Sequence, residues 1–168
     1  MKKIFYSLFA VVLFTACNTK EPVRYFSASP EIEITKSILK AYTDAKWDAM
    51  KSHYADTAKI CNNVTDKNGV VIDAAIADYI MEHDLFSAIG YVAEEDFFEM
   101  VLTDEGETWV NYWGLWVGTL RSTGEKYELP VHITLRFENQ KVVREHGYWN
   151  NSDIELALYK LEIQSQEP

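Results

Sequence analysis

The sequence predicts an α+β domain in which helices cover one face of an antiparallel sheet. Apolar residues recur at helical spacing through much of the first half of the chain. The second half instead alternates apolar and polar residues in long segments that short turns separate, and one last helical pattern closes the chain. With 168 residues, 48% of them hydrophobic, the chain has the length and apolar content of one packed domain.

The N-terminal segment has the pattern of a secretory signal peptide. Lys2 and Lys3 precede an uncharged, mostly apolar run over residues 4–16, which is too short to span a membrane. Small residues and then Cys17 end this run. This ending resembles the lipobox of bacterial lipoproteins, with Phe14 in place of the usual leucine, and it predicts lipidation of the cysteine.

The chain is therefore expected to divide into a signal peptide (1–16), a lipidated cysteine with a polar tether (17–29) and one domain (30–168). The alternative is ordinary cleavage and release without a lipid. Lipidation places the protein in the bacterial cell envelope. Asn18 stands where some bacteria use an aspartate for inner-membrane retention, so the outer membrane is the expected location.

Charge excludes several partners. Two of the 16 basic residues lie in the signal peptide, so 14 remain in the mature chain against 26 acidic residues, a net charge of −12. Such an acidic chain disfavours nucleic acid and anionic lipid surfaces. Membrane attachment is expected through the lipid anchor alone.

Neither a metal nor a cofactor is predicted. The four histidines and the remaining cysteine, Cys61, show no ligand spacing, and no phosphate-binding glycine loop occurs. With Cys17 lipidated, Cys61 has no disulfide partner and is expected to be a buried, small apolar residue.

Helix signals punctuate the first half of the domain. Ser29 is a good N-cap and Pro30 suits the first helical position. Asp44 is expected to cap a short second helix. Asp73 is expected to cap a third helix that runs to Gly90.

Strand signals dominate the second half. A short strand is expected over 56–63. Four long strands with short turns predict an antiparallel meander, and Asp153 is expected to cap the closing helix. The four long strands are expected over residues 91–103, 108–121, 127–137 and 142–149.

The strand over 108–121 is apolar on both faces. Alternation puts Trp109 and Trp113 on one face and Tyr112 and Trp116 on the other. One face is expected to line the inside of the sheet and the other to meet a partner or a covering element, but alternation alone does not say which.

Two segments resemble the nuclear transport factor 2-like superfamily, in particular its SnoaL-like polyketide cyclase and ketosteroid-isomerase-like branches. They are "AYTDAKWDAMKSHYADTAKI" and "GLWVGTLRSTGEKYELPVHITLRFENQKVVREHGYWNN". The resemblance covers residues 31–163, although the glycine of the last turn is missing at Asn139-Gln140-Lys141. It implies a curved sheet wrapped around the long first helix, an apolar pocket at the wide end of the cone, and a homodimer through the sheet.

Catalytic candidates are few. The acidic positions of cyclase-like members fall on Gly147 and Asn150, neither of which can act as a general base. His53 is expected at the pocket rim or in a structural role. Asp96 is either a carboxyl among phenylalanines or a solvated group at a strand start. His146 is either a pocket acid-base group or, as we favour, a residue of the outer sheet face.

Strand alternation also sorts the neighbours of His146. It groups Val142 with His146 on one face of the last strand, and Glu145 with Trp149 on the other. On the preceding strand His132 is expected to point away from the helices.

The sequence thus predicts a lipid-anchored envelope protein whose domain binds a small apolar or aromatic ligand, a protein partner, or both, without catalysis. The alternatives are an isomerase, cyclase or dehydratase with an atypical site, and an envelope dimerisation or interaction module. The side chains expected to line the pocket are Trp47, Tyr54, Phe98, Trp113, Trp116, Trp149 and Asn150.

Overall fold

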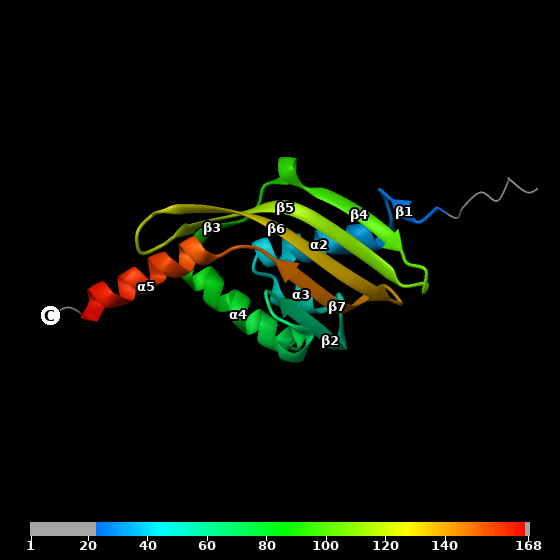
Figure 1. Ribbon diagram of the computed structural model, residues 1–168, viewed down its shortest axis with the longest axis horizontal. Helices are drawn as coiled ribbons and strands as arrows, with labels where there is room; N and C mark the ends of the chain where they lie inside the picture. Colours follow the sequence, from blue (N-terminus) through cyan, green and yellow to red (C-terminus); the bar gives the residue numbers. More distant parts are fainter. Residues whose placement is uncertain (1–22, 167–168) are drawn as a thin grey trace, which may run out of the picture.

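The computed structural model describes residues 23–166, which form a curved sheet with helices packed against one of its faces (Figure 1). The predicted signal peptide, Cys17 and most of the predicted tether lie outside the described residues. The predicted α+β class is confirmed. Among residues 23–166, no helix is long and apolar enough to cross a membrane.

Seven strands form the sheet. In spatial order β1, β4, β5, β6, β7 and β2 lie side by side. The strand β3 also pairs with β5, along a different stretch of β5 from β4. The strands span Tyr25–Phe26 (β1), Tyr54–Asn62 (β2), Phe86–Tyr91 (β3), Phe97–Leu102 (β4), Thr108–Leu120 (β5), Lys126–Glu138 (β6) and Lys141–Tyr148 (β7).

The predicted meander corresponds to β4, β5, β6 and β7, which pair antiparallel in sequence order. Alternation did not show that β2 adds to the outer edge of β7 in parallel. Parallel neighbours require a long crossover, and here most of the domain lies between the two strands. The edge of the sheet beside β7 is therefore formed by β2, the earliest long strand of the chain.

The long helix α2 (Pro30–Thr43) lies behind the middle of the sheet in Figure 1. Its start follows the sequence signals, because Ser29 Oγ accepts a hydrogen bond from the Ile32 amide at 3.2 Å and Pro30 occupies the first turn. The predicted role of Asp44 is wrong. It closes α2, and its carboxylate pairs with Lys40 and Lys46.

The helix α3 (Trp47–Lys51) begins only after Ala45, which adopts a φ of 53° in the tight turn between the two helices. The next helix, α4 (Ile72–Leu85), starts from Val71 and not from Asp73. It also ends five residues before Gly90, the predicted end, because Phe86 pairs with Leu120 and starts β3. Backbone pairing with β5 thus overrides the helical pattern beyond residue 85.

The segment from Tyr91 to Thr103 is likewise not one strand. A 3₁₀ turn, η2 (Ala93–Glu95), separates β3 from β4. A second 3₁₀ turn, η1 (Asp66–Asn68), lies after β2. The closing helix α5 (Ser152–Gln166) begins one residue before Asp153, and the Asn150 side chain accepts the Ser152 amide at 3.1 Å.

The structure decides which face of β5 is inside. Val110, Tyr112 and Trp116 are buried against the helices, at 0, 0 and 4% exposure, whereas Trp113 on the outer face is 40% exposed. On β6 the predicted alternation is confirmed: Val131, Ile133 and Leu135 are buried.

The predicted grouping on β7 is wrong for Val142. Arg136 pairs with Arg144 while Phe137 pairs with Val142, so Val143 is an extra residue in the ladder. Such a bulge shifts the alternation by one. Val142 therefore shares the inner face with Glu145, and both are buried.

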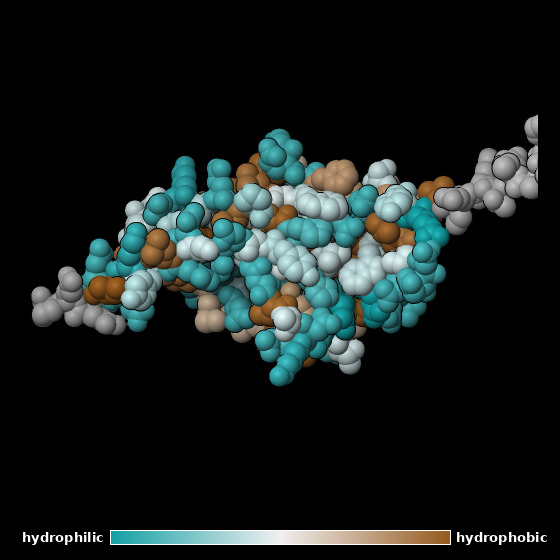
Figure 2. Space-filling view, viewed as in Figure 1, coloured by the Kyte–Doolittle hydropathy of each residue, from teal (hydrophilic) through white to brown (hydrophobic). Residues whose placement is uncertain are grey.

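Pale aromatic side chains cross the outer face of the sheet, which faces the viewer in Figure 2. The rings of Trp113 and His132 stack with 4.6 Å between their centroids. The His132 ring also stacks with that of Tyr148, with 6.2 Å between the centroids. Phe97, on the neighbouring strand β4, lies 5.5 Å from Trp113. We call these four residues the outer aromatic band.

Replacing Gly114 by alanine should destabilise the fold. A Cβ on this inner position would overlap the Tyr112 ring, which is fully buried and donates its hydroxyl to Asp96 at 2.6 Å. We expect a loss of about 1–3 kcal/mol in the free energy of unfolding, measured with urea. Thr119→Ala on the outer face of β5 is the control, with a change below about 1 kcal/mol. Equal changes in the two variants would contradict this account.

Candidate ligand pocket

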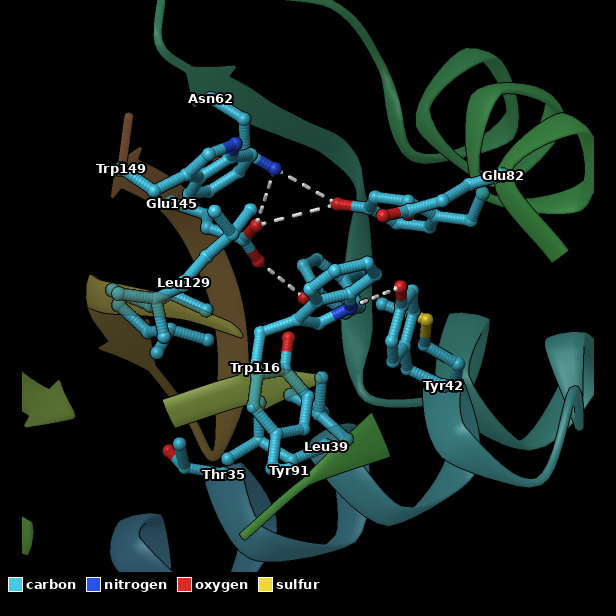
Figure 3. A pocket seen from close by; sticks show the side chains of 17 residues that line it. Thr35, Leu39, Tyr42, Asn62, Glu82, Tyr91, Trp116, Leu129, Glu145 and Trp149 are labelled. Carbon is cyan, nitrogen blue, oxygen red and sulfur yellow. Dashed lines mark hydrogen bonds between the residues drawn. The ribbon is translucent and has the colours of Figure 1, made fainter. Parts of the chain in front are cut away.

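A cavity opens between the inner face of the sheet and the helices α2, α3 and α4 (Figure 3). Its volume is about 70 Å³, whereas one water molecule needs roughly 10–15 Å³ on the same measure. The cavity therefore has room for a small organic molecule. Most of its wall is aliphatic or aromatic, including Leu39, Ile133 and Trp116.

One end of the cavity is polar and is built around Glu145 on β7, which is only 4% exposed. Its Oε2 accepts the Tyr54 hydroxyl at 2.5 Å. Its Oε1 accepts the amide of Asn62 at 3.1 Å and the Tyr79 hydroxyl at 3.5 Å. Asn62 also donates to the Tyr79 oxygen at 2.9 Å. Donors from β2 and α4 thus hold one carboxyl of β7.

Burial raises the pKa of Glu145, and the hydrogen bonds from Tyr54, Asn62 and Tyr79 oppose this shift without cancelling it. The pKa values of Tyr54 and Tyr79 lie well above the usual range for tyrosine. Burial is the largest cause, and the negative charge of Glu145 is the second. The tyrosines therefore stay protonated as donors, while the carboxyl can exchange a proton closer to neutral pH than an ordinary glutamate.

A second carboxyl, Glu82 of α4, lines the same cavity from the opposite side (Figure 3). Burial raises its pKa, and the Tyr42 hydroxyl lowers it by less. Tyr42 also accepts the indole N–H of Trp116 at 3.0 Å. This hydrogen bond links the helix α2 to β5.

These features make two kinds of chemistry available. The apolar wall can bind a hydrocarbon or aromatic body, and the two carboxyls can bind a donor or a positive charge. Because Glu145 has a raised pKa and faces the cavity, it also has the properties of a general acid or base.

The structure gathers three of the predicted pocket residues, Tyr54, Trp116 and Trp149, around this cavity. The other four lie elsewhere. Trp47 meets the Tyr42 ring edge to face and is not among the residues that line the cavity. Phe98 stacks on Tyr112 at 4.8 Å.

Trp113 and Asn150 are the remaining two. Trp113 belongs to the outer aromatic band, on the opposite face of β5 from Trp116. Asn150 is exposed at the start of α5, where its side chain caps the helix.

The catalytic candidates from the sequence do not line the cavity. His53 is half-buried beside Lys141, and burial lowers its pKa. Asp96 accepts the Tyr112 hydroxyl at the turn before β4. His146 lies on the outer face of β7, where its ring stacks on Tyr148.

Cys61, Asp66 and His146 bring three potential ligand atoms within 4.8 Å of one another in the described part of the chain. Asp66 already accepts Arg144 at 2.8 Å, and burial raises the pKa of the Cys61 thiol. A bound metal needs the thiolate. In the described structure these side chains contact one another and Arg144.

Sequence reasoning missed the polar end of the pocket, namely Asn62, Tyr79 and Glu145, and it also missed Glu82 on the opposite side. One signal was available. Glu145 precedes Gly147 by two residues and so shares its face, which is the face where the family resemblance places an acid. Gly147 itself has no room for a side chain, because a Cβ would collide with Asn62 and Trp149.

Glu145→Gln should change how stability depends on pH. Between about pH 4.3, where an unfolded glutamate titrates, and its higher folded pKa, Glu145 holds a proton that the unfolded chain has released. The free energy of unfolding of the wild type should therefore fall as pH rises through this window. Glutamine stays neutral and should lack this fall.

Urea unfolding at a series of pH values measures the difference between the two proteins. Glu128→Gln, at an exposed position of β6, is the control and should follow the wild type. Parallel profiles for wild type and Glu145→Gln would contradict the raised pKa.

No protein-family profile and no curated protein sequence matches the chain. Solved structures do match. A protein from Shewanella denitrificans, provisionally described as a SnoaL-like polyketide cyclase, aligns with a TM-score of 0.59 at 15% identity, over 79% of this chain and 99% of its own.

Two further solved structures agree. A nuclear transport factor 2-like protein from Burkholderia pseudomallei aligns with a TM-score of 0.58 at 15% identity, over 76% of this chain and 95% of its own. A protein with a ketosteroid isomerase-like fold from Catenulispora acidiphila, in complex with trimethylamine, aligns with a TM-score of 0.56 at 11% identity. The alignment covers 71% of this chain and 87% of that protein. At these identities the likeness shows the fold: the chain has the curved α+β cone fold of the nuclear transport factor 2-like superfamily.

Proposed function

We propose that this protein binds a small molecule in the cavity between the sheet and α2, α3 and α4, with a polar group of the ligand against Glu145. The observation that supports this proposal is the buried Glu145 carboxyl, held by three donors at one end of a mostly apolar cavity. Burying a carboxyl costs free energy, and its retention at this position favours a functional role. The trimethylamine complex of the Catenulispora acidiphila protein supports small-molecule binding in a cone of this kind.

An enzyme of the isomerase, cyclase or dehydratase type is the second candidate. The raised pKa of Glu145 favours it, since a carboxyl that titrates closer to neutrality can move a proton. Several neighbours of this fold are provisionally described as polyketide cyclases or as a hydroxylase. In this reading Glu145 replaces His53, Asp96 and His146 as the acid-base group.

The outer aromatic band favours an additional role in protein interaction, with a second copy or another envelope protein. Phe97, Trp113 and Tyr148 are 57, 40 and 52% exposed on one face. Contiguous exposed aromatic groups of this kind mark interaction surfaces. The cavity opens from the inner face, so ligand binding and interaction can operate together.

We further propose that a lipid on Cys17 anchors the domain in the cell envelope, at the outer membrane. Support comes from the signal-peptide pattern, the lipobox-like ending and Asn18. The acidic mature chain leaves the lipid as the expected means of membrane attachment.

Native mass spectrometry of the protein purified without denaturant tests the pocket. The wild type should carry the extra mass of a small molecule. Leu129→Trp, on the inner face of β6, should lose that mass because the larger ring fills the cavity. Leu115→Trp is a matched control on the outer face of the neighbouring strand and should keep it. The same spectra report whether the chain is a monomer or a dimer. A wild type without extra mass, and without thermal stabilisation by any of a set of small apolar compounds, would refute the pocket.

Cys17→Ser tests the anchor. The wild type, expressed in a bacterial host, should sediment with the membranes and incorporate radiolabelled palmitate. The variant should lose the label and move to the supernatant. Membrane association that persists in Cys17→Ser would refute the lipid anchor.

A further inference from the structure

We propose that the cavity selects a small organic ammonium ion, free in solution, whose charge lies between Glu82 and Glu145 and whose alkyl groups contact a wall of aromatic rings. This inference rests on the proposed function, because it names the class of ligand for the same cavity.

The charges around the cavity are of one sign. Of the 17 residues that line it, Glu82 and Glu145 are acidic, and no lysine, arginine or histidine is among them. Neither carboxyl takes part in any of the ion pairs between described residues. The cavity therefore has two acidic groups and no basic counterpart, and a cationic ligand supplies the missing charge.

Aromatic rings form much of the remaining wall. Tyr42 meets Tyr79 edge to face, with 5.5 Å between the ring centroids, and lies 5.7 Å from Tyr91 at an angle of 50°. Faces of tyrosine and tryptophan attract alkylammonium groups, most strongly when the site is desolvated. The aromatic residues that line the cavity are Tyr42, Tyr54, Tyr79, Tyr91, Trp116 and Trp149.

The hydrogen-bond donors are arranged to support the charged carboxylate. Tyr54, Asn62 and Tyr79 all direct donors at Glu145, and the Tyr42 hydroxyl acts to lower the pKa of Glu82. Burial raises the pKa of both carboxyls. A bound cation acts against burial, since a nearby opposite charge favours the ionised form.

The wall also distinguishes an organic cation from a metal ion. Magnesium and calcium take about six or more oxygen ligands at short range. Here the two carboxyls lie on opposite sides of the cavity, on β7 and α4, and aliphatic and aromatic groups form most of the rest of its wall (Figure 3). An ammonium ion with methyl groups fits such a surface, because only its charge needs the carboxyls.

Isothermal titration calorimetry with two probes of the same shape tests the proposal. Choline carries a trimethylammonium group, and 3,3-dimethylbutan-1-ol replaces its nitrogen by carbon and is neutral. We expect choline to bind the purified protein at least about tenfold more tightly at near-physiological salt, a difference of about 1.4 kcal/mol. Glycerophosphocholine, the soluble form of a lipid headgroup, should bind more weakly than choline because its phosphate adds a negative charge beside two acids.

Variants locate the effect. Glu82→Gln should weaken choline about tenfold or more and leave the neutral alcohol within about threefold. Glu145→Gln should do the same, and Glu82→Gln carries the test alone if Glu145→Gln fails to fold. Glu128→Gln removes the same charge from an exposed site outside this cavity and should leave choline binding within about twofold.

The outcomes separate the two claims. Equal affinity for choline and the alcohol would overturn the ammonium inference and leave the cavity as an apolar ligand site. Glycerophosphocholine binding as tightly as choline would overturn the choice of a free ligand. No binding of either probe, together with no co-purified molecule, would overturn this inference and the proposed function alike.

Discussion

The buried carboxyl of Glu145 is where three separate parts of the chain meet. Tyr54 and Asn62 reach it from β2, Tyr79 reaches it from α4, and the carboxyl itself belongs to β7. An unpaired carboxylate at this depth would cost several kcal/mol, so the three donors must be in place together. The edge strand, the covering helix and the last strand are thereby fixed relative to one another, and with them the polar end of the cavity.

Two departures from regular strand geometry make this meeting possible. The bulge at Val143 returns Glu145 to the inner face beside Val142, and the parallel pairing of β2 with β7 brings Asn62 opposite Gly147. Gly147 leaves the space that Asn62 and Trp149 occupy. Local periodicity contains no sign of the bulge, because one extra residue in a ladder is set by the pairing partner.

The tryptophan-rich strand β5 shows how far pattern reasoning reached at the site. Alternation correctly separated Trp113 from Trp116, but both faces were apolar, so the pattern could not say which one faced the helices. Tyr54, Trp116 and Trp149, which line the cavity, could be named from the sequence because they are large aromatics within the segments that resemble the family. Glu82 and Glu145 were missed because acidic residues on a helix and a strand look like solvated surface until burial is known.

The sequence alone determined the α+β class, the capped start of α2 and the strands β2, β5, β6 and β7, since these depend on local periodicity and capping. The tertiary structure decided the end of α4 at Leu85, the strand β3, the inner face of β5 and the gathering of two carboxyls around one cavity. Each of these depends on pairing or burial between residues far apart in the chain. Such contacts override local preference, and no single window of sequence contains them.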